Sequence, residues 1–150
     1  MITARMRRLI EENTIGFVAT VTPDGAPSVS PKGTTVVLDD AHVAFADIRS
    51  PQTVRNIRAN PAVELNFIDV FRRQACRLKG CAAYHPHGEA RFEELLPHFQ
   101  KWETLVDRMR GFVVVDVVKA EIVLSPIYDL GGTEDELKAQ WLARYNELHG

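Results

Sequence analysis

The chain has few cysteines, no long hydrophobic run and no excess of one charge. Its 150 residues include two cysteines, and 18 lysines and arginines stand against 20 aspartates and glutamates, for a net charge of −2. Balanced charge provides no global basic field of the kind that holds nucleic acid or an anionic membrane. No segment reaches about 18 consecutive apolar residues, and the first 13 residues lack the apolar centre of a signal peptide. We therefore expect a cytoplasmic protein without nucleic-acid or membrane partners.

Several catalytic signatures are also missing. The sequence has neither the Gly-x-Ser-x-Gly elbow of serine hydrolases nor a glycine-rich phosphate loop. Its two cysteines, Cys76 and Cys81, are five residues apart on one expected strand. Because successive side chains of a strand alternate between its faces, the two thiols should point apart, and we expect no disulfide between them.

Short β-type segments dominate the pattern between residues 16 and 124. Residues 16–30 (GFVATVTPDGAPSVS) indicate a hairpin whose turn is Thr22-Pro23-Asp24-Gly25, with Gly25 free to take a positive φ. Pro27 and Pro31 cannot donate to a ladder, so their strand should lie at a sheet edge or contain a bulge. Further strands are expected in residues 34–47 (two strands around Asp39-Asp40), 63–70, 74–85 and 111–124.

Helical signals lie mainly around these strands. Residues 2–10 are amphipathic, and Ser50-Pro51 is a typical helix start for a segment that stops before Asn60-Pro61. Residues 88–110 carry apolar side chains at helical spacing, with a kink or restart expected at Pro97. The many short strands and few helices predict an antiparallel barrel in a single domain, residues 1–150.

A C-terminal helix is expected at about residues 133–148. Thr133-x-x-Glu136 forms a capping box at its start. Leu137, Trp141, Tyr145 and Leu148 then follow at helical spacing and form one apolar stripe. Such a stripe is typical of a core or an interface.

Two stretches are suited to binding an anion. Residues 47–56 combine a helix N-terminus with Arg49 and the hydroxyls of Ser50 and Thr53, and free N–H groups at such an end attract phosphate. In the second stretch, residues 28–34, Lys32 stands beside Gly33, which lets an anion or a planar ring approach the backbone. Taken singly, the first is also typical of a well-capped surface helix and the second of an exposed β-bulge.

A third stretch contains ligand types that zinc prefers. Cys81, His85 and His87 share a strand face by parity. A closed zinc site needs a fourth ligand, and Pro86 disturbs the strand geometry. A metal-binding module is therefore one alternative, and a polar strand end is the other.

Taken in chain order, these stretches resemble the FMN-binding split β-barrel of pyridoxamine 5′-phosphate oxidase-like proteins. The resemblance covers about residues 10–125 and rests on the segments GFVATVTPDGAPSVSPKGTTVV, VAFADIRSPQTVRNIRANPAVELNF and CRLKGCAAY. It implies a fold that is mainly β with peripheral helices (α+β), a six- to seven-stranded antiparallel split β-barrel. In this family FMN lies in a groove between two subunits.

The resemblance also implies a set of cofactor-binding residues. Those expected along the flavin ring and ribityl chain are Ser30, Lys32, Gly33 and Thr34. Those expected at the phosphate end are Asp47, Ile48, Arg49, Ser50, Gln52 and Thr53. No side chain stands out as a catalytic acid or base, and no metal ligand is expected.

Two departures from the authentic oxidase matter. That enzyme has a Ser-Arg-Lys run where this chain has Ser50-Pro51-Gln52, and it ends in an Arg-Leu-x-Pro segment where this chain ends in QWLARYNELHG. Oxidation of pyridoxamine phosphate is therefore not the implied activity. The expectation is an FMN-dependent oxidoreductase of unknown substrate, with a small-molecule electron donor and acceptor. An F420-dependent reductase and a non-catalytic flavin carrier or redox sensor are the alternatives.

Assembly as a homodimer is expected, because six short strands cannot enclose a tricyclic ring alone. The near-continuous apolar run at residues 112–118 and the stripe of Trp141 and Tyr145 provide material for an interface. Since each flavin would contact both subunits, its binding and dimerisation should be linked.

Overall fold

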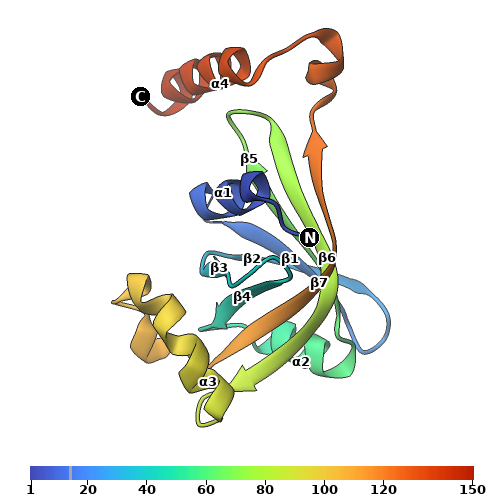
Figure 1. Ribbon diagram of the computed structural model, residues 1–150, viewed down its shortest axis with the longest axis vertical. Helices are drawn as coiled ribbons and strands as arrows, with labels where there is room; N and C mark the ends of the chain where they lie inside the picture. Colours follow the sequence, from blue (N-terminus) through green and yellow to red (C-terminus); the bar gives the residue numbers. More distant parts are fainter. Residues whose placement is uncertain (14) are drawn as a thin grey trace.

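The computed structural model describes residues 1–13 and 15–150 (Figure 1). Within them, seven strands form one sheet in the order β2-β1-β5-β6-β7-β4-β3, and every neighbouring pair is antiparallel. The strands are β1 (Gly16–Val21), β2 (Pro27–Lys32), β3 (Thr35–Val37), β4 (His42–Asp47), β5 (Ala62–Asp69), β6 (Gln74–Pro86) and β7 (Gly111–Leu124). The sheet curls into the expected split barrel.

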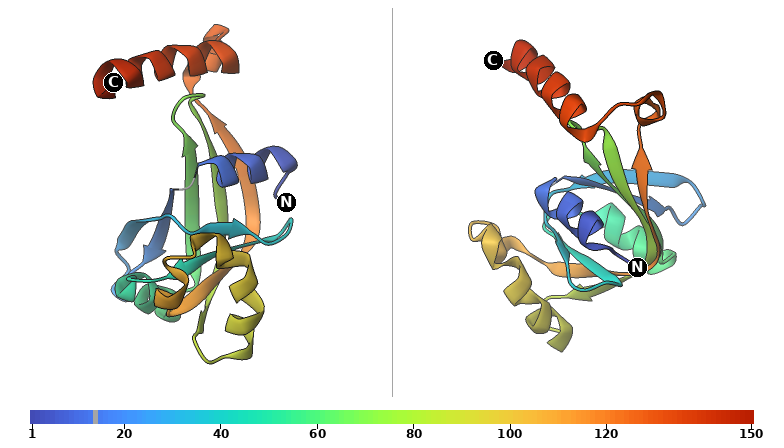
Figure 2. Two further views of the ribbon diagram at one scale, coloured as in Figure 1. Left: turned by 90° about the vertical axis from the view of Figure 1, so that its left-hand side faces the viewer. Right: turned by 45° about the horizontal axis from the view of Figure 1, so that its top comes forward.

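The helices surround this sheet. They are α1 (Ala4–Glu12), α2 (Pro51–Ala59), α3 (Ala90–Leu95) and α4 (Glu134–His149), with 3₁₀ segments at Leu96–Trp102, Val106–Arg108 and Pro126–Leu130. Helix α4 lies across the end of the β5–β6 hairpin, far from α2 and α3 at the other end of the molecule (Figures 1 and 2). No helix of the described residues is long and apolar enough to cross a membrane.

The main core fills the inner side of the curled sheet. Met6, Leu9 and Ile10 of α1 pack there with inward side chains of the strands, among them Phe45 and Leu65, which are fully buried. The apolar face predicted for residues 2–10 is thus confirmed as the face that closes the barrel.

A second core lies on the outer side of β4 and β7. Phe112 stacks on Phe99 with ring centroids 4.2 Å apart and on Phe92 at 4.6 Å. All three rings are buried. Aromatic stacking adds to the stabilisation that burial of large apolar surfaces gives, so the segment after β6 is held firmly against the sheet.

Several local predictions are confirmed. Strand β2, with Pro27 and Pro31, is an edge strand, and Gly25 has a φ of +87°. The residues of β5 alternate as predicted, and Cys76 is buried while Cys81 is exposed. The capping box of Thr133 and Glu136 is formed.

Two expectations need correction. The segment between β6 and β7 restarts at Pro97 as expected, but it continues as two 3₁₀ segments rather than as a second stretch of α-helix. The apolar run from Phe112 is not surplus material for an interface. Its apolar side chains are buried within the chain's own cores, except that of Val118, which is 74% exposed.

The C-terminal stripe behaves differently. Leu137 is buried, whereas Leu142, Tyr145 and Leu148 are 40%, 50% and 60% exposed. Trp141 of the same stripe contacts the body of the molecule, with the Arg73 guanidinium 3.3 Å from the centroid of its ring. The Tyr145 ring also packs edge-on against Phe71, with centroids 5.7 Å apart. Helix α4 is therefore held through Trp141 and Tyr145, while Leu142, Leu148 and part of Tyr145 remain exposed.

Candidate functional site

The two anion-type stretches meet in the structure. Lys32, the last residue of β2, donates from its Nζ to the Ser50 Oγ at 2.6 Å. One turn further along α2, the hydroxyls of Ser30 and Thr53 are 3.3 Å apart. A row of three hydroxyls and one ammonium thus joins the edge strand to the start of the helix, and we call these four residues the β2–α2 seam.

The start of α2 is open to an anion. Ser50 is the N-cap residue, but its side chain makes no capping hydrogen bond; its hydroxyl oxygen accepts from Lys32 instead. Pro51 has no N–H, so the first amide groups that point out of the helix belong to Gln52 and Thr53. The first N–H groups of a helix have no partner within it, and here the usual side-chain acceptor is turned away.

Asp47 supports the seam through hydrogen bonds of its carboxylate. Its buried carboxylate accepts from the Ser50 backbone N–H at 3.0 Å and from the Tyr84 hydroxyl at 2.8 Å. Burial lowers the pKa of Lys32, and the negative charge of Asp47 opposes that shift. For Tyr84, burial and the hydrogen bond to Asp47 raise the pKa to about 12. Tyr84 therefore stays a protonated donor at neutral pH.

The helix itself is tied to the barrel by amide and hydroxyl groups. Asn56, fully buried, donates to the Thr20 hydroxyl of β1 at 2.9 Å and accepts from the Gln52 Nε2 at 2.7 Å. Gln52 in turn accepts from Arg55 at 3.1 Å. This chain of hydrogen bonds fixes the direction in which the α2 N-terminus points.

The other expected residues take different places. Thr34 is buried, and its hydroxyl accepts from the Ala46 N–H of β4 at 3.1 Å, so it ties β4 to the chain before β3. Gly33 is exposed between the seam and Thr34. Ile48 and Arg49 line a separate hollow, together with His87, which follows β6, and residues 107–110, which precede β7. The expected phosphate end is thus divided between the seam and this hollow.

Tyr84 was missed as a site residue by sequence reasoning. It belongs to the stretch considered for zinc, and nothing in its local pattern links it to Asp47, 37 residues earlier. Across the described residues, no three histidine, cysteine or acidic side chains come together in a way that could hold a metal ion. His85 lies 3.6 Å from Glu89 instead, and the structure gives the metal alternative no support.

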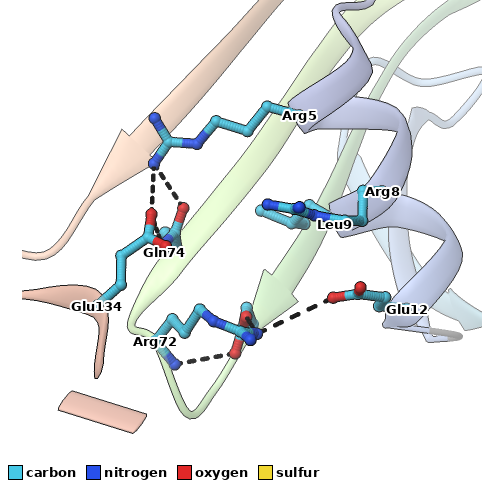
Figure 3. Close-up of a pocket in the computed structure, with 8 residues that line it drawn as sticks. Arg5, Arg8, Leu9, Glu12, Arg72, Gln74 and Glu134 are labelled. Atoms are coloured by element: carbon cyan, nitrogen blue, oxygen red, sulfur yellow. Dashed lines mark hydrogen bonds and ion pairs between the residues drawn. The ribbon is translucent and has the colours of Figure 1, made fainter. Parts of the chain in front are cut away.

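A small polar pocket at the other end of the molecule has a structural role (Figure 3). There Arg5 of α1 donates to Gln74 of β6 at 2.8 Å and pairs with Glu134 of α4 at 3.2 Å, while Arg72 pairs with Asp69 at 2.9 Å. The pocket has a volume of about 20 Å³, which is room for a water molecule rather than a cofactor. The contacts of Arg5 and Gln74 with Glu134 fasten α4 to the body.

The chain belongs to the pyridoxamine 5′-phosphate oxidase family, whose sequence model matches residues 2–123. An uncharacterized protein of Methanocaldococcus jannaschii is 36% identical over 80 residues, which cover 52% of this chain and 53% of that protein. The chain thus spans about half the length of this curated relative.

Solved structures share the fold. HupZ of Group A Streptococcus is 27% identical, with a TM-score of 0.71, and the match covers 83% of this chain and 96% of that one. An FMN-binding protein of Syntrophomonas wolfei matches at 14% identity and a TM-score of 0.66, covering 79% of this chain and 84% of its own. An F420 reductase matches at 24% identity and a TM-score of 0.59, covering 77% and 94%. The last two likenesses concern the fold alone.

Proposed function

We propose that this chain is an FMN-dependent oxidoreductase that holds the FMN phosphate at the β2–α2 seam. The observation that carries the proposal is the 2.6 Å contact between Lys32 and Ser50. It places an ammonium group at a helix N-terminus whose side-chain cap is missing. Backbone N–H groups, a helix dipole and a fixed cation together form a site for a phosphate dianion.

The residues present fit this group. The amides of Gln52 and Thr53 and the hydroxyls of Ser30, Ser50 and Thr53 are donors, and Lys32 supplies the charge. Asp47 does not oppose binding strongly, because its carboxylate already accepts two hydrogen bonds and serves to hold Ser50. When bound, the flavin would supply the redox chemistry by accepting a hydride at its N5.

The protein's own part is then positioning and electrostatics. The chain of hydrogen bonds from Thr20 through Asn56 to Gln52 keeps the α2 N-terminus in one orientation. A site that is arranged in advance does not lose binding energy to reordering when the ligand arrives. None of these groups needs to exchange a proton with a substrate.

Purified protein tests the proposal directly. We expect flavin absorbance that elutes with the protein, or that does so after FMN is added to the flavin-free chain. Mass spectrometry of the molecule released on denaturation then identifies it. Retention of neither FMN nor F420 at micromolar concentration would overturn the proposal.

F420 is the second candidate, because the family's fold also occurs in an F420 reductase. The same mass measurement separates F420 from FMN. Turnover is a separate question, since the seam could equally serve a flavin carrier or redox sensor. Steady-state reduction of an added acceptor by NADH or NADPH supports the enzyme, and bound flavin that is never reduced supports the carrier.

We further propose that the chain acts as a homodimer. The strip of Leu142, Tyr145 and Leu148 on α4 is 40–60% exposed, and exposed apolar surface of this kind is typical of an interface. A second copy is the fitting occupant, because in this family FMN lies in a groove between two subunits. Obligate dimers of this type bury more than about 2,000 Å² in total.

Sedimentation equilibrium with and without FMN tests the dimer. We expect a dimer that Leu142→Ser combined with Leu148→Ser weakens, whereas Lys138→Ser on the same helix leaves it unchanged. A monomer that retains stoichiometric flavin at low micromolar concentration contradicts the shared site.

A further inference from the structure

A second basic site lies beside the β2–α2 seam. A hollow of about 530 Å³ is lined by Ile48 and Arg49 after β4, His87 after β6, and the segment from Asp107 to Arg110 before β7. Its volume is in the range of about 300–1,000 Å³ that is usual for small-molecule sites. We call it the basic hollow.

The charges around the basic hollow are not compensated. Most arginines of the chain have a carboxylate, an amide or an aromatic ring as partner, as in the pairs of Arg77 with Glu64 and of Arg58 with Tyr84. Over residues 1–13 and 15–150, four arginines have no side-chain hydrogen bond, ion pair or aromatic partner: Arg8, Arg49, Arg108 and Arg110. Three of these four line the basic hollow. Asp107 is the single acidic residue there, so the hollow carries excess positive charge.

The wall of the hollow is fixed by backbone contacts. The Arg110 N–H donates to the Asp47 carbonyl at 2.8 Å, and the Arg110 carbonyl accepts from the His87 N–H at 2.8 Å. The His87 ring packs against Phe92 with centroids 4.9 Å apart. These contacts between the ends of β4, β6 and β7 therefore fix the positions of the cationic residues relative to one another.

Asp47 connects the basic hollow to the seam. Its backbone carbonyl accepts a hydrogen bond from the Arg110 N–H, and its carboxylate accepts one from the Ser50 N–H. The positive charge of Arg110 also acts on Tyr84, whose pKa it lowers against the stronger effect of burial. The basic hollow and the seam are thus neighbours that share one residue, yet each has its own cationic groups.

We propose that the basic hollow binds a small organic anion, a carboxylate or phosphate on an apolar body, that is distinct from the flavin phosphate. The arginines would hold the anionic group, since guanidinium groups match carboxylate and phosphate oxygens in pairs. Ile48 and buried Met109 give the apolar contact. The binding of this anion can be tested without any flavin. Its role as the reaction partner of the flavin rests on the proposed function.

The experiment uses phenyl phosphate as the probe and phenol as its uncharged counterpart, by calorimetric titration of the full chain with and without FMN. We expect phenyl phosphate to bind and phenol to bind at least about 10-fold more weakly. Arg108→Gln combined with Arg110→Gln should weaken phenyl phosphate by a further factor of 10 or more. Arg8→Gln is the matched control, because Arg8 is also exposed and without a partner but lies outside the hollow; it should change nothing.

The FMN affinity of the same variants separates this proposal from the previous one. We expect the double variant to bind FMN as tightly as the unmodified chain. A parallel loss of FMN and phenyl phosphate overturns the second site, because the hollow would then be the flavin's own phosphate site. Equal binding of phenol, or equal weakening by Arg8→Gln, also overturns it. A chain that binds phenyl phosphate at this hollow but never FMN supports the anion site and refutes the proposed function.

Discussion

Replacement of Lys32 by methionine should weaken cofactor binding and leave the stability of the flavin-free chain nearly unchanged. Methionine keeps most of the length and the apolar stem of lysine but removes the ammonium group. The Ser50 hydroxyl then loses its 2.6 Å donor and becomes free to cap α2. In that position its oxygen competes with a phosphate for the same N–H groups.

The size of the effect on affinity follows from the kind of contact that is lost. A hydrogen bond to a charged group contributes about 1.5–3 kcal/mol, which corresponds to a factor of about 10–150 in dissociation constant. Without ligand, burial disfavours the charged lysine and lowers its pKa, so its removal costs little. We expect the midpoint of thermal unfolding to stay within about 3 °C, because replacing a partly buried charge by an apolar group is often neutral.

Quenching of FMN fluorescence gives the dissociation constant, and circular dichroism gives the unfolding midpoint. Lys138→Met is the control, because Lys138 is exposed on α4 at the far end of the molecule. The reasoning fails if Lys32→Met binds FMN as tightly as the unmodified chain, or if the control weakens binding to the same extent.

Three further predictions concern the seam and the second core. Affinity for FMN should fall as the pH rises through the lowered pKa of Lys32, since the ammonium charge is present only below that pKa; riboflavin, titrated in parallel, should show no such fall. Phe112→Ala should lower the free energy of unfolding by about 3–5 kcal/mol in urea titrations, because it removes the ring between Phe92 and Phe99. Gly111→Ala should cost about 1–3 kcal/mol, because a Cβ there overlaps the Tyr84 ring; an unchanged unfolding midpoint contradicts this packing, and Tyr84→Phe serves as the comparison.

Local sequence signals predicted most of the fold correctly. Proline in the ladder identifies β2 as an edge strand, and the Thr133–Glu136 spacing identifies a helix start, because these effects act within a few residues. The segment after Pro86 was harder to predict. The apolar residues of this segment are spaced as in an α-helix. They are apolar because they pack on β4 and β7, and 3₁₀ turns around Pro97 bring them to that surface as well as an α-helix would.

The site was predictable in its parts and not in its arrangement. Lys32 and Ser50 each belong to an anion-type stretch, yet their contact depends on how β2 and α2 meet in space. Tyr84 and Arg110 reach Asp47 from strands that follow much later in the chain. A local sequence pattern does not predict contacts between residues so far apart in the chain. The division between the seam and the basic hollow therefore follows only from the three-dimensional structure.

The dissociation constants of FMN and riboflavin for the unmodified chain test the central claim most directly. The two molecules share the isoalloxazine ring and differ in the phosphate, so their ratio isolates the contribution of the seam. With the phosphate at the N-terminus of α2, beside Lys32, FMN should bind at least about 10-fold more tightly. Equal affinities would show that no phosphate is held there and would contradict the account.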